Sequence, residues 1–490
     1  MTDAWRIFLC LTACGLGFAV LQRVAGRKNP IPAGHILAIL FGLYTACLFL
    51  LLTARPIMAA LCALSLLTLL LTLNRAKEKA LREPLIPADA YLLPLVFRYP
   101  HLYFPFLPIR VITASLAILA LAFATLLLLE KPLPLIRTVN AAASLICAVL
   151  LFPAIIFLLR AGFFPTISAR LLSIFPCSSD AARDAAHNGL MAPLLNHFVW
   201  AAAFTRSQPD FLRTPHIRPT ASSFPESMEQ TLADMENTPP DQLPHIILIQ
   251  AESFCDIRKH VDEPLKNALT GFLPNWDDLK TLGRAFDPPE NAYGAYTMRT
   301  EFAMLTGLHA GDLGPWAYNP YILAAKHPLW SLARHLEARG YNTLCVHPYH
   351  KDFFSREKII PNLGFQRFLG LEELDYLKKF GPYTSDFALS NMVTTELTAS
   401  EQSGRPLFCF IITMEAHGPW LPGRLTEEAM RDTLPELTAD MCEQSLRMYL
   451  CHLRHMDMMF KIVAEENTKT ERKERERKVW AYGDHMPGVA

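Results

Sequence analysis

The stretch His245-Ile-Ile-Leu-Ile-Gln250, followed closely by Glu252, decides the fold class of the C-terminal half. A short apolar run without interruption is typical of a parallel strand that is buried on both faces. Similar runs lie at Thr343–Val346, Leu407–Ile412 and Val479–Tyr482. Helical patterns separate them, for example Leu329–Arg339 and Ser445–Val463. This alternation predicts an α/β domain with a mainly parallel sheet.

Polar residues follow the predicted strands, where a parallel sheet gathers its ligands. They are Glu252, His347, His417, Asp484 and His485. Carboxylates and imidazoles, with a hydroxyl nearby, suit a divalent ion such as Mn²⁺. Each residue by itself is more often an ordinary solvated or hydrogen-bonded side chain. Their joint position after buried strands favours a metal site.

A second stretch supplies the hydroxyl: Tyr293-Gly-Ala-Tyr-Thr-Met-Arg-Thr-Glu-Phe-Ala-Met-Leu-Thr-Gly307. Apolar residues recur in and after it at helical spacing: Phe302, Leu305 and Leu308. The pattern predicts a loop leading into a helix that begins near Thr297, and a helix N-terminus attracts anions such as phosphate. Taken alone, Thr297 or Thr300 is more often an ordinary cap. Of the two, we expect Thr297 to be the nucleophile, and Thr300 to cap or to bond back within the first turn.

Composition bounds the rest of the chain. Its 490 residues predict two or more domains, and a net charge of zero argues against a nucleic-acid partner. The eleven cysteines form no CxxC pair and no zinc-like cluster. Five apolar segments are long enough to span a bilayer. They are Trp5–Val24, Ile36–Thr53, Pro56–Leu73, Val111–Leu129 and Ala141–Leu159.

These segments predict three parts: a transmembrane domain at 1–160, a proline-rich connector at 161–243 and a catalytic domain at 244–490. Lysine and arginine concentrate in the first and third loops between the spans. The positive-inside rule places such loops in the cytoplasm, and with five spans the C-terminal part would join them there. The segment Leu85–Leu107, within the third loop, has the aromatic and proline content of an interfacial or re-entrant piece.

From about Pro244 the chain resembles the lipoteichoic acid synthase-type phosphoglycerol transferases of the alkaline phosphatase/sulfatase superfamily. The matching pieces are Glu252-Ser-Phe, Gly294-Ala-Tyr-Thr-Met-Arg-Thr-Glu-Phe302, His347 with Phe353-Phe-Ser-Arg356, Glu415-Ala-His-Gly-Pro419 and Tyr482-Gly-Asp-His485. Two features depart from the family pattern. Phe354 stands where the family usually has tryptophan, and the chain ends five residues after His485, so we expect a shortened C-terminal portion.

The resemblance implies a role for each matching residue. Glu252, Thr297, Asp484 and His485 would hold one divalent ion, for which we expect Mn²⁺, with Mg²⁺ and Zn²⁺ as alternatives. Thr297 would also be the catalytic nucleophile. His417 would act with it and contact the substrate phosphate, and His347 and Arg356 would contact the head group. Arginine suits that role because its planar fork binds phosphate through two hydrogen bonds.

The implied function is a membrane-anchored transferase. It would move a phosphoglycerol-type head group from a phospholipid, expected to be phosphatidylglycerol, to a glycan or polymer acceptor through a phospho-threonine. The family layout places the catalytic domain in the periplasm, on the outer side of the inner membrane. The loop charges predict the opposite side. Alternatives are a phosphoethanolamine transferase, a phosphodiesterase, or a non-catalytic membrane protein that binds lipid or glycan. Sulfatase chemistry is disfavoured because threonine cannot be converted to that family's formylglycine.

Overall fold

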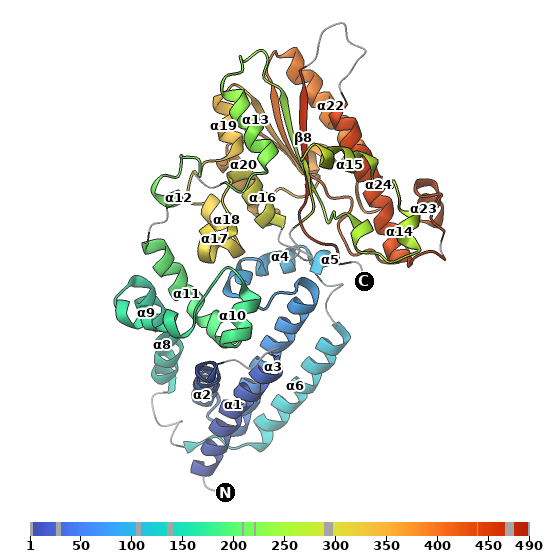
Figure 1. The fold of residues 1–490 in the computed structure, drawn as a ribbon. Coiled ribbons are helices and arrows are strands. Elements are labelled where there is room, and N and C mark those ends of the chain that lie inside the picture. The colour runs from blue at the N-terminus through green and yellow to red at the C-terminus, as the bar shows by residue number, and fades with distance from the viewer. Residues whose placement is uncertain are drawn as a thin grey trace. The chain divides into compact units, whose positions relative to one another are not determined.

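The chain forms two compact units, Met1–Pro209 and Asp210–Ala490 (Figure 1). The computed structural model describes residues 3–25, 31–103, 109–134, 141–207, 210–219, 222–288, 297–438, 440–465 and 475–488. The predicted connector is therefore divided: 161–209 belongs to the first unit and 210–243 to the second. Each unit has its own apolar core.

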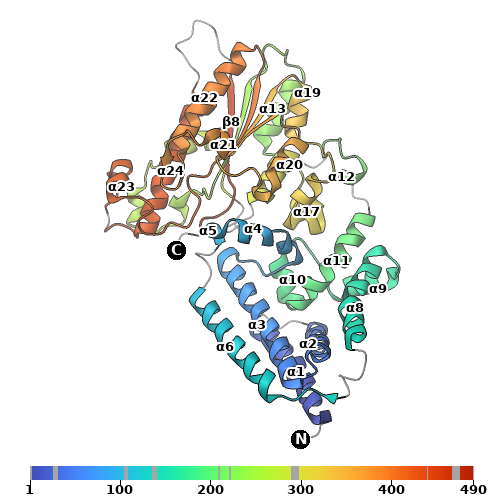
Figure 2. The same cartoon turned by 180° about the vertical axis from the view of Figure 1, so that it is seen from behind.

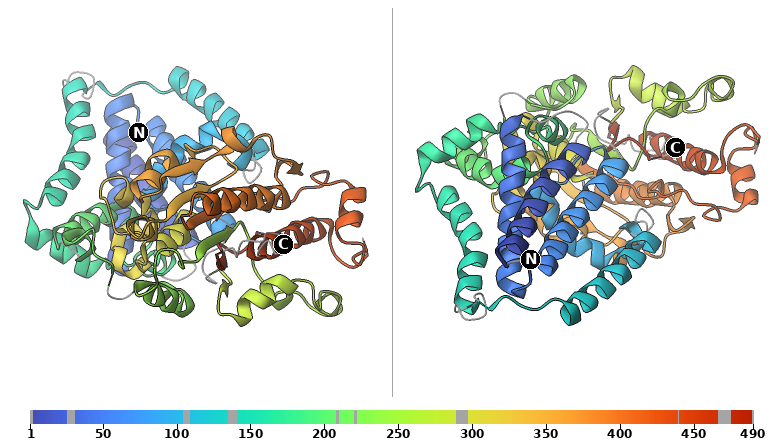
Figure 3. Two further views of the ribbon diagram at one scale, coloured as in Figure 1. Left: turned by 90° about the horizontal axis from the view of Figure 1, so that it is seen from above. Right: turned by 90° about the horizontal axis from the view of Figure 1, so that it is seen from below.

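Long apolar helices make up the first unit. They are α1 (Asp3–Ala25), α2 (Pro32–Thr53), α3 (Pro56–Leu81), α6 (Ile109–Leu129) and α8 (Ala141–Ala161). Helices α1, α2 and α3 lie side by side (Figure 3). Among the described residues, four helices are long and apolar enough to cross a membrane: α1, α2, α3 and α6. Several side chains of α8 lie outside the described part, so the fifth crossing stays a prediction.

Polar contacts mark the end of this bundle where α1 begins. Glu130, just after α6, accepts hydrogen bonds from the backbone N–H groups of Ile57 and Met58 at 2.8 and 2.9 Å. These are donors of the first turn of α3, which has no other partner for them within the helix. Arg6 of α1 pairs with the same carboxylate at 2.9 Å. Glu130 thus joins three helices at one end.

Short helices gather at the opposite end of the bundle. They are η1 (Pro87–Tyr91), α4 (Leu93–Arg98), α5 (Pro100–Tyr103), α9 (Pro165–Ile174), α10 (Ala181–Asn188) and α11 (Met191–Arg206). Ile31, between α1 and α2, donates from its backbone N–H to the carbonyl of His187 in α10 at 3.0 Å. Helix α11 packs against η1 in the third loop. The chain after α8 therefore lies at the end that carries both cationic loops.

A six-stranded parallel sheet organises the second unit, with strand order β2-β8-β1-β7-β3-β4. Its strands are β1 (His245–Ala251), β2 (Ala285–Phe286), β3 (Asn342–Val346), β4 (Arg367–Leu369), β7 (Leu407–Ile412) and β8 (Arg477–Gly483). All four predicted strands are confirmed, and so is the parallel α/β class. Every residue of β1 is buried, as expected for a strand covered on both faces.

Helices cover both faces of the sheet (Figures 1 and 2). One face packs on α15 (Pro274–Thr281), α22 (Asp386–Gln402) and α24 (Gln444–Ala464), and the other on α13 (Glu226–Glu236), α16 (Thr297–Thr306) and α19 (Leu332–Ala338). The remaining elements are α12 (Asp210–Arg213), α14 (Leu265–Ala268), α17 (Ala310–Leu313), α18 (Tyr321–Ala324), α20 (Arg356–Asn362), α21 (Leu371–Leu374), α23 (Glu427–Thr433), β5 (Lys379–Phe380), β6 (Tyr383–Thr384), η3 (Ile257–Lys259), η4 (Gly314–Tyr318) and η5 (Phe353–Ser355).

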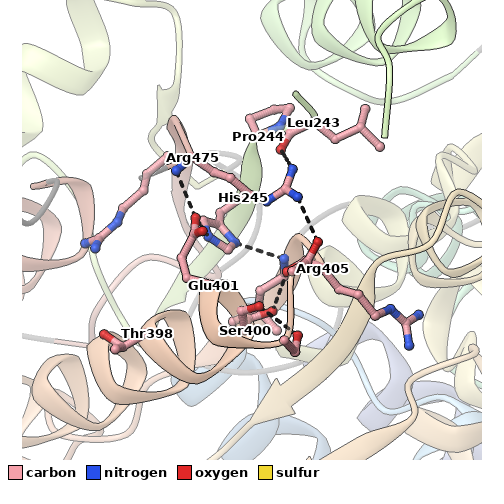
Figure 4. Close-up of polar contacts among 12 residues, drawn as sticks. Leu243, Pro244, His245, Thr398, Ser400, Glu401, Arg405 and Arg475 are labelled. Carbon is pink, nitrogen blue, oxygen red and sulfur yellow. Dashed lines mark hydrogen bonds and ion pairs between the residues drawn. The ribbon is translucent and has the colours of Figure 1, made fainter. Parts of the chain in front are cut away.

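The amino ends of the central strands are fastened by polar contacts of the buried His245 and the exposed Arg405 (Figure 4). His245 Nδ1 accepts from the backbone N–H of Leu407, so its Nε2–H donates to Glu401 at 2.8 Å. Arg405 donates to the carbonyls of Gly340 and Tyr341 at 2.9 and 3.1 Å. These contacts hold the sheet at the edge away from the predicted site.

Candidate active site

Three buried ionisable side chains meet at the carboxyl ends of β1 and β8. Glu252 follows β1, and Asp484 and His485 follow β8, which pairs with β1 in parallel. One potential ligand atom from each lies within 4.8 Å of the others. His485 Nε2 is 3.5 Å from Glu252 Oε1 and 3.4 Å from Asp484 Oδ2. The structure thus brings together three of the four residues predicted to hold a metal.

Backbone geometry locks the two turns that carry these residues. The backbone N–H of Ser253 donates to Asp484 Oδ1, and its hydroxyl donates to Glu252 Oε1, both at 2.8 Å. Ser253 has φ of 53°, a left-handed conformation that costs energy for a residue with a Cβ. Gly483 leaves no room for a side chain, because a Cβ there would lie 1.9 Å from the carbonyl oxygen of Phe254.

The three groups change one another's protonation. Burial raises the pKa of Asp484 to about 6, and the nearby carboxylate of Glu252 adds to that rise. Burial also raises the pKa of Glu252, against the opposing effect of His485. Burial alone would lower the pKa of His485, but the two carboxylates outweigh it and raise that pKa. Two carboxylates held together away from water favour a bound cation.

The donor set fits a divalent ion. Asp484 Oδ2 is buried and has no hydrogen-bond partner within the described protein. The Nδ1–H of His485 donates to the carbonyl of Met486 at 3.2 Å, so Nε2 faces the carboxylates and would bind an ion after it loses its proton. A carbonyl partner on the second ring nitrogen is the usual arrangement of metal-binding histidines.

Thr297 begins helix α16, as the sequence predicts, and its residue is 9% exposed. Its side chain lies close enough to the Asp484 carboxyl to lower the pKa of that group, against the effect of burial. The predicted nucleophile therefore lies beside the acidic group. The predicted approach loop, including Gly294, lies outside the described residues.

The prediction for Thr300 was wrong. Its hydroxyl donates to the backbone carbonyl of Asp484 at 2.9 Å, a residue 184 positions away, and not to its own first turn. Helix α16 starts at Thr297, so Thr300 lies about one turn later, on nearly the same side of the helix. Its side chain therefore also faces the turn after β8. Thr300 thus joins α16 to the loop that carries the metal-site residues.

Removing this hydroxyl should weaken the catalytic unit. We expect Thr300→Ala to lower the free energy of unfolding by about 1 kcal/mol, because the Asp484 carbonyl loses its donor. Thermal unfolding would show a drop of roughly 2–4 °C for a unit of this size. Thr300→Ser keeps the hydroxyl and should melt near the wild-type temperature. Equal melting of the alanine variant and the wild type would contradict this role.

Glu301 points into the domain, where Arg356 neutralises its charge. Arg356 Nη2 is 2.8 Å from Glu301 Oε2, and Gln250 donates to the same oxygen at 3.3 Å. Arg356 Nη1 donates to His347 Nε2 at 3.2 Å, and His347 Nδ1–H donates to the carbonyl of Ile412 at 3.2 Å. His347 and Arg356 are thus neighbours, as predicted, but their described polar contacts are with the protein. Their contact with a head group stays a prediction.

His417 follows β7 and is partly exposed. Its Nδ1–H donates to the carbonyl of Gly418 at 2.7 Å, which makes Nε2 the acceptor nitrogen. Although the residue keeps some exposed surface, the protein packed around its ring shields it from water and lowers the pKa of His417 to about 4. The charges of His485 and Arg424 act in the same direction. The ring is therefore neutral at pH 7, with its centroid 5.8 Å from that of Tyr383.

Sequence reasoning missed several residues that shape this edge. Thr413, the first residue after β7, accepts a hydrogen bond from the backbone N–H of Glu252 at 2.9 Å. Its position directly after a predicted strand could have marked it. Arg424 also supports the loop of His417, and so does Glu415, which the resemblance gives only within a matching motif and without a role. Neither residue lies directly at a strand end. Spacing along the chain therefore gave no signal for them.

A parallel sheet with carboxylates, an imidazole and a hydroxyl at its carboxyl edge is the arrangement of the metal-dependent alkaline phosphatase and sulfatase superfamily. Residues 244–490 match the family model described as Sulfatase, so the chain belongs to the sulfatase family.

The chain is also similar to several individual proteins. The "Capsular polysaccharide biosynthesis protein RkpI" of Rhizobium meliloti is 28% identical over 444 residues, which cover 88% of this chain and 74% of that protein. The phosphoglycerol transferase GacH of Streptococcus pyogenes, solved with sn-glycerol-1-phosphate, aligns over 56% of this chain and 72% of its own, with 21% identity and a TM-score of 0.37. The lipoteichoic acid synthase LtaP of Listeria monocytogenes aligns over 50% of this chain and 56% of its own, with 18% identity and a TM-score of 0.37.

Proposed function

We propose that this protein is a membrane-anchored transferase that moves a phosphoglycerol-type head group from a phospholipid to a glycan or polymer. The observation that carries the proposal is the convergence of Glu252, Asp484 and His485 beside the hydroxyl of Thr297. Together they would hold one divalent ion, expected to be Mn²⁺. When bound, such an ion stabilises charge on phosphoryl oxygens and lowers the pKa of a coordinated hydroxyl.

The chain's own residues then carry two displacements. The oxygen of Thr297 attacks the phosphorus of the lipid, the bond to the glycerol oxygen of diacylglycerol breaks, and diacylglycerol leaves with the proton as an alcohol. An acceptor hydroxyl next attacks the phospho-threonine. The bond between phosphorus and Thr297 breaks, and the acceptor proton passes to the threonine oxygen. The enzyme is thereby returned to its starting state.

We propose that His417 is the imidazole that takes part in the reaction. Its Nε2 is an acceptor, because Nδ1–H is used by the Gly418 carbonyl. A neutral imidazole with an acceptor nitrogen can hold a hydroxyl group of the substrate and take its proton during attack. We propose that His417 contacts the substrate beside the phosphoryl group, through the hydroxyl that attacks the phosphorus. His347 and Arg356 would contact the head group, and their present bonds to each other and to Glu301 would have to give way to that contact.

A glycan is the acceptor class that the similar proteins favour. The Rhizobium meliloti relative, which aligns over most of this chain, is named for capsular polysaccharide biosynthesis. The apolar helices of the first unit would hold the enzyme in the membrane where its lipid donor lies. We expect phosphatidylglycerol to be that donor.

Mass spectrometry of the purified full chain tests the proposal. After incubation with Mn²⁺ and labelled phosphatidylglycerol, we expect a glycerophosphate adduct on Thr297 and released diacylglycerol. An adduct that forms only from phosphatidylethanolamine would indicate a phosphoethanolamine transferase. If the head group is released to water even when a glycan acceptor is present, the protein would be a phosphodiesterase. Lipid binding without adduct or turnover would overturn the enzymatic proposal.

Sidedness provides a separate test, because two arguments disagree. The layout of the lipoteichoic acid synthase-type transferases predicts a periplasmic catalytic unit. The chain after α8, however, lies at the end with the cationic loops, which normally face the cytoplasm. We expect the periplasmic location. Fusion of alkaline phosphatase after residue 240 should be active, and fusion of green fluorescent protein there should be dark. The reverse pattern would place the unit in the cytoplasm.

A further inference from the structure

One arginine binds the backbone of the loop that presents His417. Arg424 Nη2 donates to the carbonyl of Glu415 at 2.8 Å, and Nη1 donates to the carbonyl of Pro419 at 3.1 Å. Nη1 also donates to the carbonyl of His417 itself. Three alternate carbonyls therefore turn toward a single guanidinium. A planar fork can serve them together, whereas a lysine ammonium on its flexible stem cannot hold that geometry.

The same arginine supports the aromatic neighbour of His417. Its guanidinium carbon lies 5.5 Å from the centroid of the Tyr383 ring, which in turn contacts the His417 ring edge to face. Its charge also acts on the site, because it lowers the pKa of His417 and of Glu252. Arg424 thus contacts both the loop and the aromatic neighbour of His417, and its charge acts on the site. It does not belong to the predicted metal group.

Other contacts fix only the start of this loop. The Glu415 carboxylate is buried and accepts from Nδ1 of His452 and His455, both on α24, at 2.9 and 3.0 Å. It also accepts from the backbone N–H of Asp386 at 2.7 Å. These anchors end two residues before His417. Among the described contacts, Arg424 is the side chain that holds the carbonyls of His417 and Pro419.

We infer that Arg424 is a positioning residue, which fixes His417 for the reaction by holding the backbone of residues 415–419. The inference rests on the proposed function. It predicts a loss in kcat and not in substrate binding, because the arginine acts on the placement of the imidazole. Misplacement of a catalytic group by about 1 Å can cost on the order of 10²-fold in rate.

The test compares Arg424→Lys with Arg424→Ala in the full chain with Mn²⁺ bound. We expect both to lower kcat by about 10²-fold with KM within about twofold, and the lysine variant keeps the charge if the alanine variant fails to fold. Arg405→Lys is the matched control, because Arg405 also binds two backbone carbonyls but lies near the amino end of β7. It should keep wild-type kcat. Wild-type kcat in Arg424→Lys would overturn the inference.

A double-mutant cycle separates positioning from general support. In a His417→Ala background, Arg424→Lys should cause little further loss, because the group it positions is gone. A full additional loss would mean that Arg424 acts elsewhere, and the inference fails. Nitrogen-15 NMR of the labelled histidines gives a readout that needs no turnover. Arg424→Lys should disturb the Nδ1–H tautomer of His417, and an unchanged tautomer would contradict the inference even if the proposed function were wrong.

Discussion

Replacement of Thr297 by alanine is expected to lower turnover of phosphatidylglycerol by about 10⁴-fold or more, as for removal of other catalytic nucleophiles. The reason is chemical, because alanine has no oxygen that can attack phosphorus or carry the phosphoryl group. The same variant should show no adduct by mass spectrometry. Thr297→Ser keeps a hydroxyl and should keep measurable activity and the adduct.

A matched control lies on the same helix. Thr306 is fully buried in α16, and its hydroxyl donates to the carbonyl of Phe302 at 2.8 Å, away from the metal group. Thr306→Ala should therefore retain turnover while removing the same atoms from the same helix. Near wild-type turnover by Thr297→Ala, with the control also active, would eliminate the covalent mechanism.

Loss of Asp484 should abolish stoichiometric metal binding. Mutation of a residue that only hydrogen-bonds to a metal ligand typically lowers the metal affinity about 10- to 100-fold. Removal of a direct ligand should lower the affinity further. By elemental analysis, we expect the metal content to fall from one Mn²⁺ per chain in the wild type toward zero in Asp484→Ala. Asp484→Asn keeps an oxygen that can accept from the Ser253 backbone N–H, so it tests the lost charge with less damage to the turn.

Asp457 provides the control for this experiment. Its buried carboxylate caps α15 by accepting from the backbone N–H of Trp276 at 2.8 Å and from the side chain of Asn275 at 2.7 Å. Asp457→Ala should lower stability but keep one metal ion per folded chain. Full metal occupancy in both Asp484 variants would show that the proposed ligand set is wrong.

Local patterns were sufficient to predict the architecture. The apolar run that starts at His245 became β1, and the stretch after Tyr293 became a helix that begins at Thr297. Parallel strands align their carboxyl ends, so residues placed just after β1 and β8 had to meet. The likeness to a known family selected Glu252, Asp484 and His485 from the strand-end residues as the metal ligands, a choice that spacing alone did not make.

The hydrogen-bond partners were beyond the reach of the sequence. Thr300 binds a carbonyl 184 positions away, and Arg356 pairs with Glu301 across 55 positions. Such contacts depend on how α16, α20 and the strand-end turns are placed in space, and periodicity carries no information on that placement.

The sequence by itself determined the apolar helices, the parallel sheet and the strand-end acids, because hydrophobic periodicity acts within a single element. The tertiary structure alone decided that Arg424 holds the His417 loop and that Glu415 is anchored by two histidines of α24. Those choices depend on burial, since a polar atom away from water must find whichever partner the packed helices bring within reach.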